Sequence, residues 1–227
     1  MMYLNQIYPG IFEINDGNRK LATCNMVPGT SVYGEKLVEI EGREYREWNP
    51  RRSKLAAMAI KKFPVHITQD SKILYLGASA GTTVSHVSDI VSEGIVYAVE
   101  FSSRVMRDLV GLCEMRSNII PVLSDASRPL SYSGTVEMVD VIFQDIAQPN
   151  QAEIAAINSY HYLKDGGLLM LTIKARSVDT VADPKKIYQS QLRELMNVEE
   201  GKFEIIKKSE LSPFHQDHLA VIARFER

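Results

Sequence analysis

The sequence predicts an α/β fold in which a mostly parallel sheet follows a small β-rich segment. From residue 50 onward, short apolar runs alternate with stretches of helical periodicity, which is typical of a parallel sheet with right-handed crossovers. Before residue 49, short apolar pieces are separated by turn residues instead. The chain has 227 residues, of which 45% are hydrophobic, enough for one substantial domain and a small second one. We therefore expect domains at residues 1–48 and 49–227.

The N-terminal domain is expected to consist of β-hairpins. Its apolar pieces are Ile11–Ile14, Leu21–Cys24 and Leu37–Ile40, and the segments 15–18 and 28–29 supply turns. A sheet of this size buries few apolar side chains by itself, so it should pack on the main domain or on a second protein.

The main domain is expected to begin with a helix at residues 53–63 and then to alternate strand and helix. Strands are predicted at 73–76, 96–99, 119–123, 139–143 and 167–173, with helices near 82–92, 103–115, 151–163 and 184–197. Two more strands, at 203–209 and 218–225, follow in succession and can pair antiparallel at one edge. Together these elements predict a mostly parallel seven-stranded sheet with an antiparallel edge strand.

The segment from Lys72 to Glu100 is the first βαβ unit of this sheet and carries the clearest functional signal. Gly77 and Gly81 bracket a tight turn after the first strand, where backbone without a Cβ can approach a ligand closely. Glu100 ends the second strand, a position from which an acid can hydrogen-bond ribose hydroxyls. The alternative is an ordinary strand–helix turn, which requires both the loop and the acid to be accidental. We predict an adenosine-containing cofactor.

The residues of this turn indicate which cofactor it binds. A dinucleotide fingerprint starting at Gly77 needs glycine at two positions that hold Ser79 and Thr82, which counts against a nicotinamide-dependent oxidoreductase. The loop G-A-S-A-G instead resembles the glycine loop of S-adenosylmethionine-dependent methyltransferases, which have a Rossmann-like fold. That loop usually carries an acid two residues before its first glycine, where this chain has Tyr75.

Composition excludes several classes of protein. No apolar run is long enough to span a membrane, and the N-terminus lacks the basic flank and apolar core of a signal peptide. We therefore expect a cytoplasmic protein without a membrane partner. Cys24 and Cys113 are expected to be free thiols, and no Cys/His cluster has the spacing of a metal site.

The charge is close to neutral, at −2, and unevenly distributed. Residues 43–62 contain seven basic and two acidic side chains. Such a segment could contact phosphates or be the solvated face of a helix, and the charge run leaves both open. The near-neutral net charge does not by itself indicate a nucleic-acid partner.

Charged residues follow three of the predicted strands, at the edge where ligands of open α/β sheets bind. Asp125 is placed to accept from an adenine amino group, although Asp is also a common turn residue. Asp145 and Lys174 each follow a strand that should be buried, where charges are usually paired. A structural ion pair and a catalytic pair fit this spacing equally well.

Two longer strings resemble a known family. Residues 48–57 read W-N-P-R-R-S-K-L-A-A, and residues 77–86 read G-A-S-A-G-T-T-V-S-H. Both are similar to the signature of the fibrillarins. In that family, the departure at Tyr75 from the acid of the general methyltransferase loop is normal. The resemblance covers essentially the whole chain, and the absence of a Gly/Arg-rich N-terminal extension makes it a resemblance to the archaeal form.

The resemblance implies an RNA 2′-O-methyltransferase that works with S-adenosyl-L-methionine inside box C/D ribonucleoproteins. The implied partners are a Nop-domain scaffold protein, a kink-turn-binding protein, a box C/D guide RNA, and rRNA and tRNA substrates. The implied catalytic set is Lys54, Asp145, Lys174 and His218, with His215 as an alternative histidine. The predicted cofactor site comprises Gly77, Ala78, Ser79, Gly81, Thr82, Thr83, Glu100, Phe101, Asp125, Ala126, Asp145 and Gln148.

The expected reaction is an in-line methyl transfer to a ribose hydroxyl. Good orientation of the hydroxyl can supply about 7–11 kcal/mol of the barrier reduction, and a nearby base adds about 10²–10⁴-fold. Lys174 is a candidate for steering the hydroxyl and accepting its proton, whereas Asp145 could itself be the base or only orient Lys174. A non-catalytic ribonucleoprotein scaffold is a further alternative, against which the presence of Lys54, Asp145 and Lys174 counts.

Overall fold

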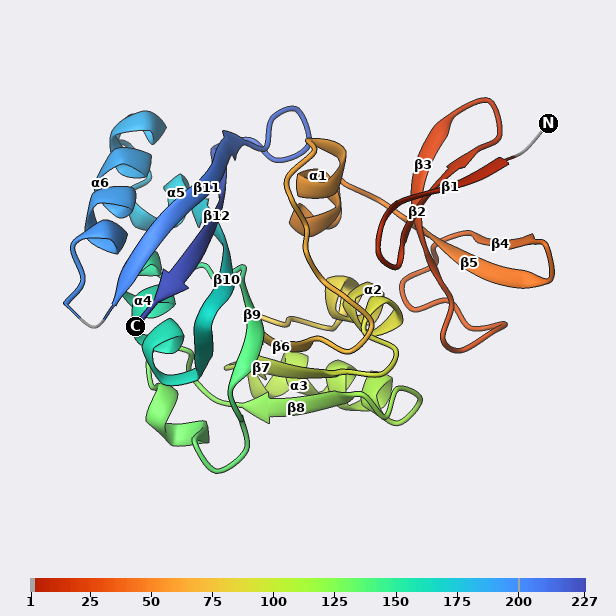
Figure 1. The fold of residues 1–227 in the computed structure, drawn as a ribbon, viewed down its shortest axis with the longest axis horizontal. Coiled ribbons are helices and arrows are strands. Elements are labelled where there is room, and N and C mark those ends of the chain that lie inside the picture. The colour runs from red at the N-terminus through yellow and green to blue at the C-terminus, as the bar shows by residue number, and fades with distance from the viewer. Residues whose placement is uncertain (1–2, 200) are drawn as a thin grey trace.

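Two sheets organise the residues that the computed structural model describes, 3–199 and 201–227 (Figure 1). The N-terminal sheet is antiparallel and consists of β1 (Tyr3–Tyr8), β2 (Ile11–Asn15), β3 (Arg19–Cys24), β4 (Leu37–Ile40) and β5 (Arg43–Trp48). Its strand order is β1-β2-β3-β5-β4. The sequence predicted three of these strands and missed β1 and β5.

The main sheet has seven strands in the order β11-β12-β10-β9-β6-β7-β8. They are β6 (Lys72–Leu76), β7 (Ile95–Glu100), β8 (Ile119–Leu123), β9 (Val139–Gln144), β10 (Leu163–Lys174), β11 (Lys202–Glu210) and β12 (His218–Glu226). Strands β8, β7, β6, β9 and β10 pair in parallel. The antiparallel strand is β12, which lies between β10 and the edge strand β11. The predicted fold class is confirmed, with the antiparallel strand one place in from the edge.

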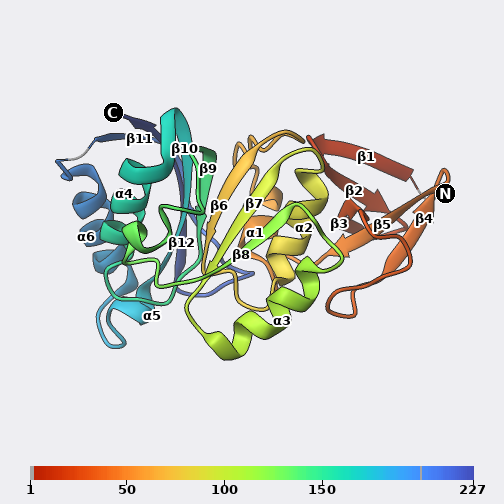
Figure 2. The ribbon, with the colours of Figure 1, turned by 90° about the horizontal axis from the view of Figure 1, so that it is seen from below.

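Helices cover both faces of the main sheet (Figure 2). They are α1 (Lys54–Ile60), α2 (Thr82–Ile90), α3 (Ser103–Cys113), the 3₁₀ helix η1 (Pro129–Tyr132), α4 (Gln151–Tyr162), α5 (Ala175–Val178) and α6 (Pro184–Met196). Successive side chains of a strand point to opposite faces, so Ile73 and Tyr75 pack against α1, α2 and α3. Leu74 and Leu76 pack on the other side, in the core shared with α4 and α6.

Element boundaries differ from the prediction where proline, glycine or charge interrupts the pattern. Helix α1 ends at Ile60, and Lys62 has a positive φ of 56° one residue before Phe63-Pro64. Strand β10 begins at Leu163 because the chain keeps pairing with β9 on both sides of a register shift near Gly166. The predicted helix limits are otherwise one or two residues too long at their ends.

The expected role of the basic segment is wrong for Arg46. This residue lies on β5, not on a helix, and its side chain is fully buried. It pairs with Glu35 (Nε to Oε1, 2.6 Å) and with Asp89 of α2 (Nη1 to Oδ2, 2.9 Å), so it can neither face solvent nor bind phosphate. An inward-pointing arginine on a strand with charged neighbours hides the apolar alternation, which is why β5 was missed.

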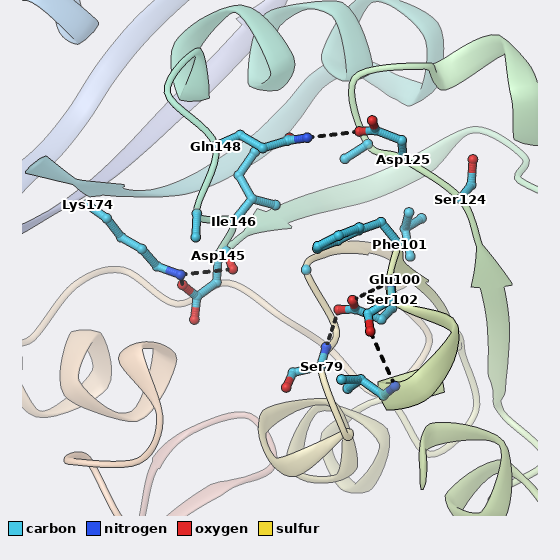
Figure 3. A pocket seen from close by; sticks show the side chains of 15 residues that line it. Ser79, Glu100, Phe101, Ser102, Ser124, Asp125, Asp145, Ile146, Gln148 and Lys174 are labelled. Atoms are coloured by element: carbon cyan, nitrogen blue, oxygen red, sulfur yellow. Dashed lines mark hydrogen bonds and ion pairs between the residues drawn. The ribbon is translucent and has the colours of Figure 1, made fainter. Parts of the chain in front are cut away.

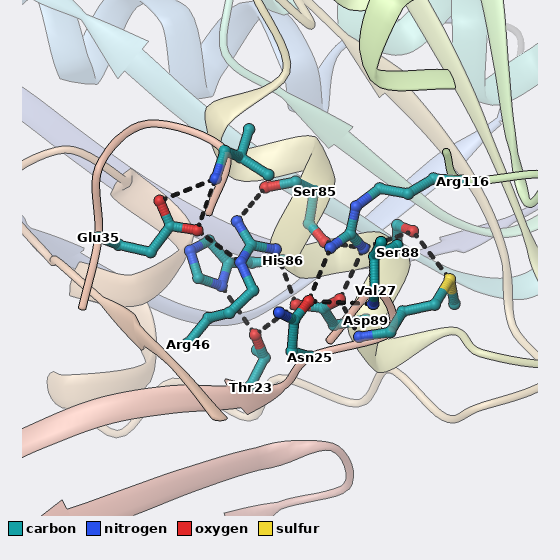
Figure 4. Close-up of polar contacts among 12 residues, drawn as sticks. Thr23, Asn25, Val27, Glu35, Arg46, Ser85, His86, Ser88, Asp89 and Arg116 are labelled. Carbon is teal, nitrogen blue, oxygen red and sulfur yellow. Dashed lines mark hydrogen bonds and ion pairs between the residues drawn. The ribbon is translucent and has the colours of Figure 1, made fainter. Parts of the chain in front are cut away.

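A buried network of hydrogen bonds and ion pairs connects the N-terminal sheet to α2 (Figure 4). Its members are Thr23, Tyr33, Glu35, Arg46, His86, Asp89 and Arg116, which we call the buried network. Thr23 donates its hydroxyl proton to Asp89 (2.7 Å), so the Nδ1–H of His86 must donate to Thr23 (2.8 Å). The N-terminal sheet therefore packs on the main domain, one of the two outcomes expected of it.

The environment of His86 keeps its imidazole neutral. The ring is fully buried and stacks on Trp48, with ring centroids 4.9 Å apart. Burial, together with the positive charges of Arg46 and Arg116, holds the pKa of His86 well below its usual value. Its Nε2 is then free to accept from the hydroxyl of Tyr33 at 2.7 Å.

Candidate functional site

A cavity of about 450 Å³ opens at the carboxyl ends of β6, β7, β8 and β9 (Figure 3). This is the edge at which open α/β sheets bind their ligands. Many of the predicted cofactor and catalytic residues line it: Gly77, Ser79, Glu100, Phe101, Asp125, Ala126, Asp145, Gln148 and Lys174. We call it the first cavity.

The glycine loop has the tight geometry that the sequence predicted. Gly77 has a φ of +86°, and a Cβ built there would lie 2.5 Å from the carbonyl oxygen of Asp145. Any other residue would push the loop away from β9. Gly81 also has a positive φ, of 90°, and caps α2, but it lines neither this cavity nor the neighbouring one. Its structural task is to let the loop pass over Leu112 of α3.

Glu100 connects the loop to the end of β7. The carboxylate is buried and accepts two backbone N–H groups, from Ser79 at 2.9 Å and from Ser102 at 2.9 Å (Figure 3). Each carboxylate oxygen retains further acceptor capacity on the cavity side. Phe101, next in the chain, leaves 74% of its surface exposed and presents its ring at the cavity. A carboxylate beside an exposed aromatic face is suited to a ribose and its base.

The opposite wall of the first cavity is formed by Asp125 and Gln148. Asp125 Oδ1 accepts from the backbone of Ser127 (2.9 Å) and from Gln148 Nε2 (3.0 Å), so it serves the turn as well as the cavity. Burial alone would raise the pKa of Asp125, but these hydrogen bonds outweigh it and the pKa is lowered. Gln148 Oε1 is buried and has no hydrogen-bond partner among the described residues. It is therefore available to a donor in the cavity.

A second cavity, of about 340 Å³, adjoins the first and shares Gly77, Ser79, Asp145 and Lys174 with it. Its other lining residues are Arg52, Lys54, Tyr75, Ala78, Thr82 and Thr83. The predicted cofactor residues Ala78, Thr82 and Thr83 thus lie in this second cavity and outside the first.

Lys54, Asp145 and Lys174 form an ion cluster in the wall between the two cavities. Lys54 Nζ lies 2.9 Å from Asp145 Oδ2, and Lys174 Nζ lies 2.9 Å from Asp145 Oδ1. The three side chains are 15–18% exposed. Burial by itself would raise the pKa of Asp145, but the two ammonium groups together outweigh it and hold the pKa below its usual value. The carboxylate is therefore ionised at neutral pH.

Neighbouring polar groups hold each lysine backbone in place. Ser53 caps α1 by accepting from the N–H of Ala56 (3.3 Å), which makes Lys54 the first residue of the helix. Gln151, at the start of α4, accepts from the backbone N–H of Lys174 (2.8 Å) and donates to its carbonyl oxygen (3.1 Å). Both lysines thus extend from fixed backbone positions.

The structure does not bring the predicted histidine into either cavity. His218 faces Lys174 in the register of β12 and β10, but its Nδ1 lies against the carbonyl oxygen of Gln216. His215 Nε2 lies 2.8 Å from the carbonyl oxygen of Pro50. Burial is the largest cause of a lowered pKa for both histidines. Of the four catalytic candidates, Lys54 and Lys174 both contact Asp145, and His218 is one strand away.

Sequence reasoning missed several lining residues. Arg52 lies inside a family string and Tyr75 lies two residues before the glycine loop, both without a predicted role, and Ile146 follows Asp145 directly, so position alone could have indicated all three. Val105 reaches the first cavity from the first turn of α3, and no pattern in the sequence distinguishes it from a core residue.

Residues 3–199 and 201–227 contain neither a cluster of metal-binding side chains nor a membrane-spanning helix. No group of three or more His, Cys, Asp or Glu side chains in this part of the chain is arranged to hold a metal ion. None of its helices combines the length and the apolar character needed to cross a membrane. Cys24 and Cys113 are free, as predicted.

Comparison with known proteins decides the family. The family model described as Fibrillarin matches residues 2–227. The chain belongs to the fibrillarin family. A curated relative from Methanosarcina barkeri, named fibrillarin-like rRNA/tRNA 2′-O-methyltransferase, is 57% identical over 226 residues, with 100% of both chains covered. The predicted family is thus confirmed.

Solved structures of fibrillarins have the same fold. One is Aeropyrum pernix fibrillarin with natively bound S-adenosyl-L-methionine, with a TM-score of 0.88, 41% identity, and 98% of this chain and 97% of that chain covered. Another is the fibrillarin component of a fibrillarin/Nop5p complex, with a TM-score of 0.87, 44% identity, and coverage of 96% and 99%.

Proposed function

We propose that this fibrillarin transfers the methyl group of S-adenosyl-L-methionine to ribose 2′-hydroxyls of rRNA and tRNA. The observation that carries the proposal is the position of the ion cluster, between a cavity suited to an adenosine and a second cavity lined by basic side chains. The full-length relative named for this activity supports it.

The first cavity fits the adenosine part of the cofactor. Its volume of about 450 Å³ lies in the usual range for small-molecule sites. Glu100 would accept from the ribose hydroxyls, Phe101 would cover the base, and the unpaired Oε1 of Gln148 would accept from a base N–H donor. The bound cofactor supplies a sulfonium methyl group, which is an electrophile that needs no metal.

The ion cluster then acts on the RNA hydroxyl. Lys174 and Asp145 line both cavities, so they can hold a hydroxyl placed between them: the Lys174 ammonium donates to the hydroxyl oxygen, and the Asp145 carboxylate receives the hydroxyl proton as the methyl group leaves the sulfonium. The lowered pKa of Asp145 makes it a weak proton acceptor before the methyl group moves, when its role is to hold the two ammonium groups and to provide negative charge. Lys174 is then the group that steers the hydroxyl.

His218 is proposed as the fourth member of the catalytic set because it faces Lys174 across paired strands. Comparing His218→Ala with His215→Ala tests this assignment. A loss of activity confined to His215→Ala would move the role to His215.

We also propose that the RNA is selected and delivered by other components. The net charge of −2 supports this, since a phosphate-binding surface that acts alone is usually broadly basic. A related fibrillarin was solved with Nop5p, which supports a Nop-domain partner here. The remaining proposed components are a kink-turn-binding protein and a box C/D guide RNA, in a cytoplasmic particle. We place the domain boundary between Trp48, which ends β5, and Asn49.

The deciding experiment combines the chain with S-adenosyl-L-methionine, a guide RNA, the partner proteins and a matched target, followed by mapping of 2′-O-methylation. We expect methylation at one nucleotide, set by pairing with the guide. Omitting the guide or the partners should abolish it. Methylation that persists without them would contradict delivery, and no methylation by the complete mixture would contradict the activity.

A further inference from the structure

The second cavity carries more positive charge than the ion cluster uses. Arg52, Lys54 and Lys174 line it together with one carboxylate, Asp145, which gives three cations, one anion and a net charge of +2. Tyr75, also in the lining, stays uncharged because burial and the nearby Asp145 raise its pKa well above the usual value. The cavity is therefore suited to an anionic ligand.

Arg52 is the cation in excess. Asp145 already pairs with both lysines, and Arg52 forms no ion pair within the described residues. Its guanidinium lies 4.7 Å from the centre of the Tyr33 ring and makes a long hydrogen bond, 3.5 Å, to the carbonyl oxygen of the same residue. A guanidinium held by a ring face keeps most of its N–H groups available for an oxyanion.

Tyr33 is itself fixed by the buried network. Its hydroxyl contacts His86 Nε2 at 2.7 Å, and its backbone N–H donates to Glu35 Oε2 at 2.8 Å. Burial and the nearby Glu35 raise the pKa of Tyr33 to about 12, so the ring stays neutral. The loop between β3 and β4 thus places a rigid aromatic face under Arg52.

The reacting ribose brings an anion of its own. In an RNA chain, the carbon next to the one that bears the 2′-hydroxyl is esterified to phosphate. A ribose hydroxyl held at the ion cluster therefore carries this phosphodiester into or beside the second cavity. We propose that Arg52 binds the phosphodiester on the 3′ side of the acceptor nucleotide, and that Tyr33 is a positioning residue for its guanidinium. This inference rests on the proposed methyltransferase function.

The carboxylate of the cofactor's methionine part is another oxyanion that could satisfy Arg52. Exposure favours the RNA. Arg52 is exposed, whereas Lys54 and Thr83 lie deeper in the same lining. A group at the outer end of the cavity is more accessible to a macromolecule than to a buried cofactor. A measurement of cofactor affinity in an Arg52 variant distinguishes the RNA phosphodiester from the cofactor carboxylate as the ligand of Arg52.

The test uses the complete particle and a target RNA that is nicked on the 3′ side of the acceptor nucleotide. The acceptor strand ends in either a 3′-phosphate or a 3′-hydroxyl, so one anion is present or absent while base pairing is kept. We expect the wild-type chain to methylate the 3′-phosphate form about 10- to 100-fold faster than the 3′-hydroxyl form, because one charge-assisted hydrogen bond contributes a factor of about this size. Arg52→Gln should slow the phosphate form by a similar factor and abolish the preference. Equal preference in both proteins would overturn the proposal.

Matched controls separate this contact from general electrostatics. Arg51 is the exposed neighbour of Arg52 and lines neither cavity, so Arg51→Gln should keep the preference for the 3′-phosphate. A nick on the 5′ side, with or without a 5′-phosphate, should give a ratio that Arg52→Gln does not change. Tyr33→Phe, which keeps the ring, should retain the 3′-phosphate preference, and Tyr33→Ala should weaken it.

Calorimetry with S-adenosyl-L-methionine completes the test. We expect the isolated Arg52→Gln chain to bind the cofactor as tightly as wild type. A fall in cofactor affinity equal to the fall in rate would assign the guanidinium to the cofactor carboxylate and overturn the proposal. If the wild-type particle does not methylate the intact target, the proposed function fails and this inference with it; methylation of the intact target without a 3′-phosphate preference on the nicked targets defeats the inference alone.

Discussion

The ion cluster and the buried network are built from the same chemistry but differ in what surrounds them. In each, one aspartate pairs with two basic side chains: Asp145 with Lys54 and Lys174, and Asp89 with Arg46 and Arg116. The first three are 15–18% exposed and face two cavities. The second three are at most 1% exposed. A shared charge pattern thus lines the candidate site in one place and joins the N-terminal sheet to α2 in the other.

The difference separates a cluster that is proposed to be reactive from a structural one. Every charge of the buried network has a partner inside the protein, since Arg46 also pairs with Glu35 and Arg116 donates to backbone and side-chain oxygens. The ion cluster leaves donor and acceptor capacity directed at open space. Burial with complete pairing therefore indicates structure, and partial burial beside a cavity indicates function.

The largest expected effect is on catalysis, at the ion cluster. Lys174→Ala or Asp145→Ala should reduce single-turnover methylation by about 10²–10⁴-fold, because the group that steers or accepts the proton is lost. Cofactor binding, measured by calorimetry, should survive. The matched control is Lys164→Ala, which removes another β10 lysine paired with an aspartate, Asp140, at an exposed surface. Full activity in both cluster variants would remove these residues from the proposed site.

The next largest effect is on stability, at the buried network. Asp89→Asn should destabilise the protein by about 3–5 kcal/mol, because two buried guanidinium groups lose their shared counter-charge. Urea unfolding followed by circular dichroism measures this. Glu204→Gln breaks an exposed pair with Arg224 and should change stability by about 1 kcal/mol or less. Equal losses in the two variants would contradict the distinction between buried and exposed pairs.

The same distinction explains what the sequence could predict. Lys54 lies in a recognisable string, whereas Asp145 and Lys174 lie at the ends of strands. Topology alone therefore places Asp145 and Lys174 at one edge of the sheet. The buried network joins residues from β3, β5, α2 and two loops, and nothing local in the sequence shows that Arg46 and Asp89 face each other. The confirmed fold class and family rest on patterns that extend over many residues, whereas this junction depends on a few long-range contacts.

Within the candidate site, the predicted cofactor residues divide in a way that the motif could not show. The glycine loop was predicted as one binding unit. The structure places Gly77 and Ser79 in both cavities, Thr82 and Thr83 in the second alone, and Gly81 in neither. The two glycines share a positive φ but have different neighbours, which become known only when β9 and α3 are placed beside the loop.

Glu100 shares one property with each group: it is buried like the residues of the buried network, and it faces a cavity like the ion cluster. Glu100→Ala should weaken S-adenosyl-L-methionine binding by about 10- to 100-fold, through lost bonds to ribose and a loop released at Ser79. Calorimetry gives the affinity, and Glu114→Ala, at an exposed position after α3, is the control. Unchanged affinity would remove Glu100 from the cofactor site.

The smallest expected effect is a pH dependence that belongs to the network alone. The folded pKa of His86 lies well below 6.5, so below that pH the unfolded chain binds a proton that the folded protein does not. Stability should therefore fall as the pH drops below about 6.5, by about 1.4 kcal/mol between pH 7.5 and 5.5 for this one histidine. His215 and His218 contribute in the same direction, because their pKa values are also lowered. They remain in His86→Gln, which should lose only the His86 share, so the stability difference between the two proteins should shrink as the pH falls. Parallel pH profiles from urea titrations would show that His86 is not held neutral by Arg46 and Arg116, and would weaken the case that complete pairing defines the network.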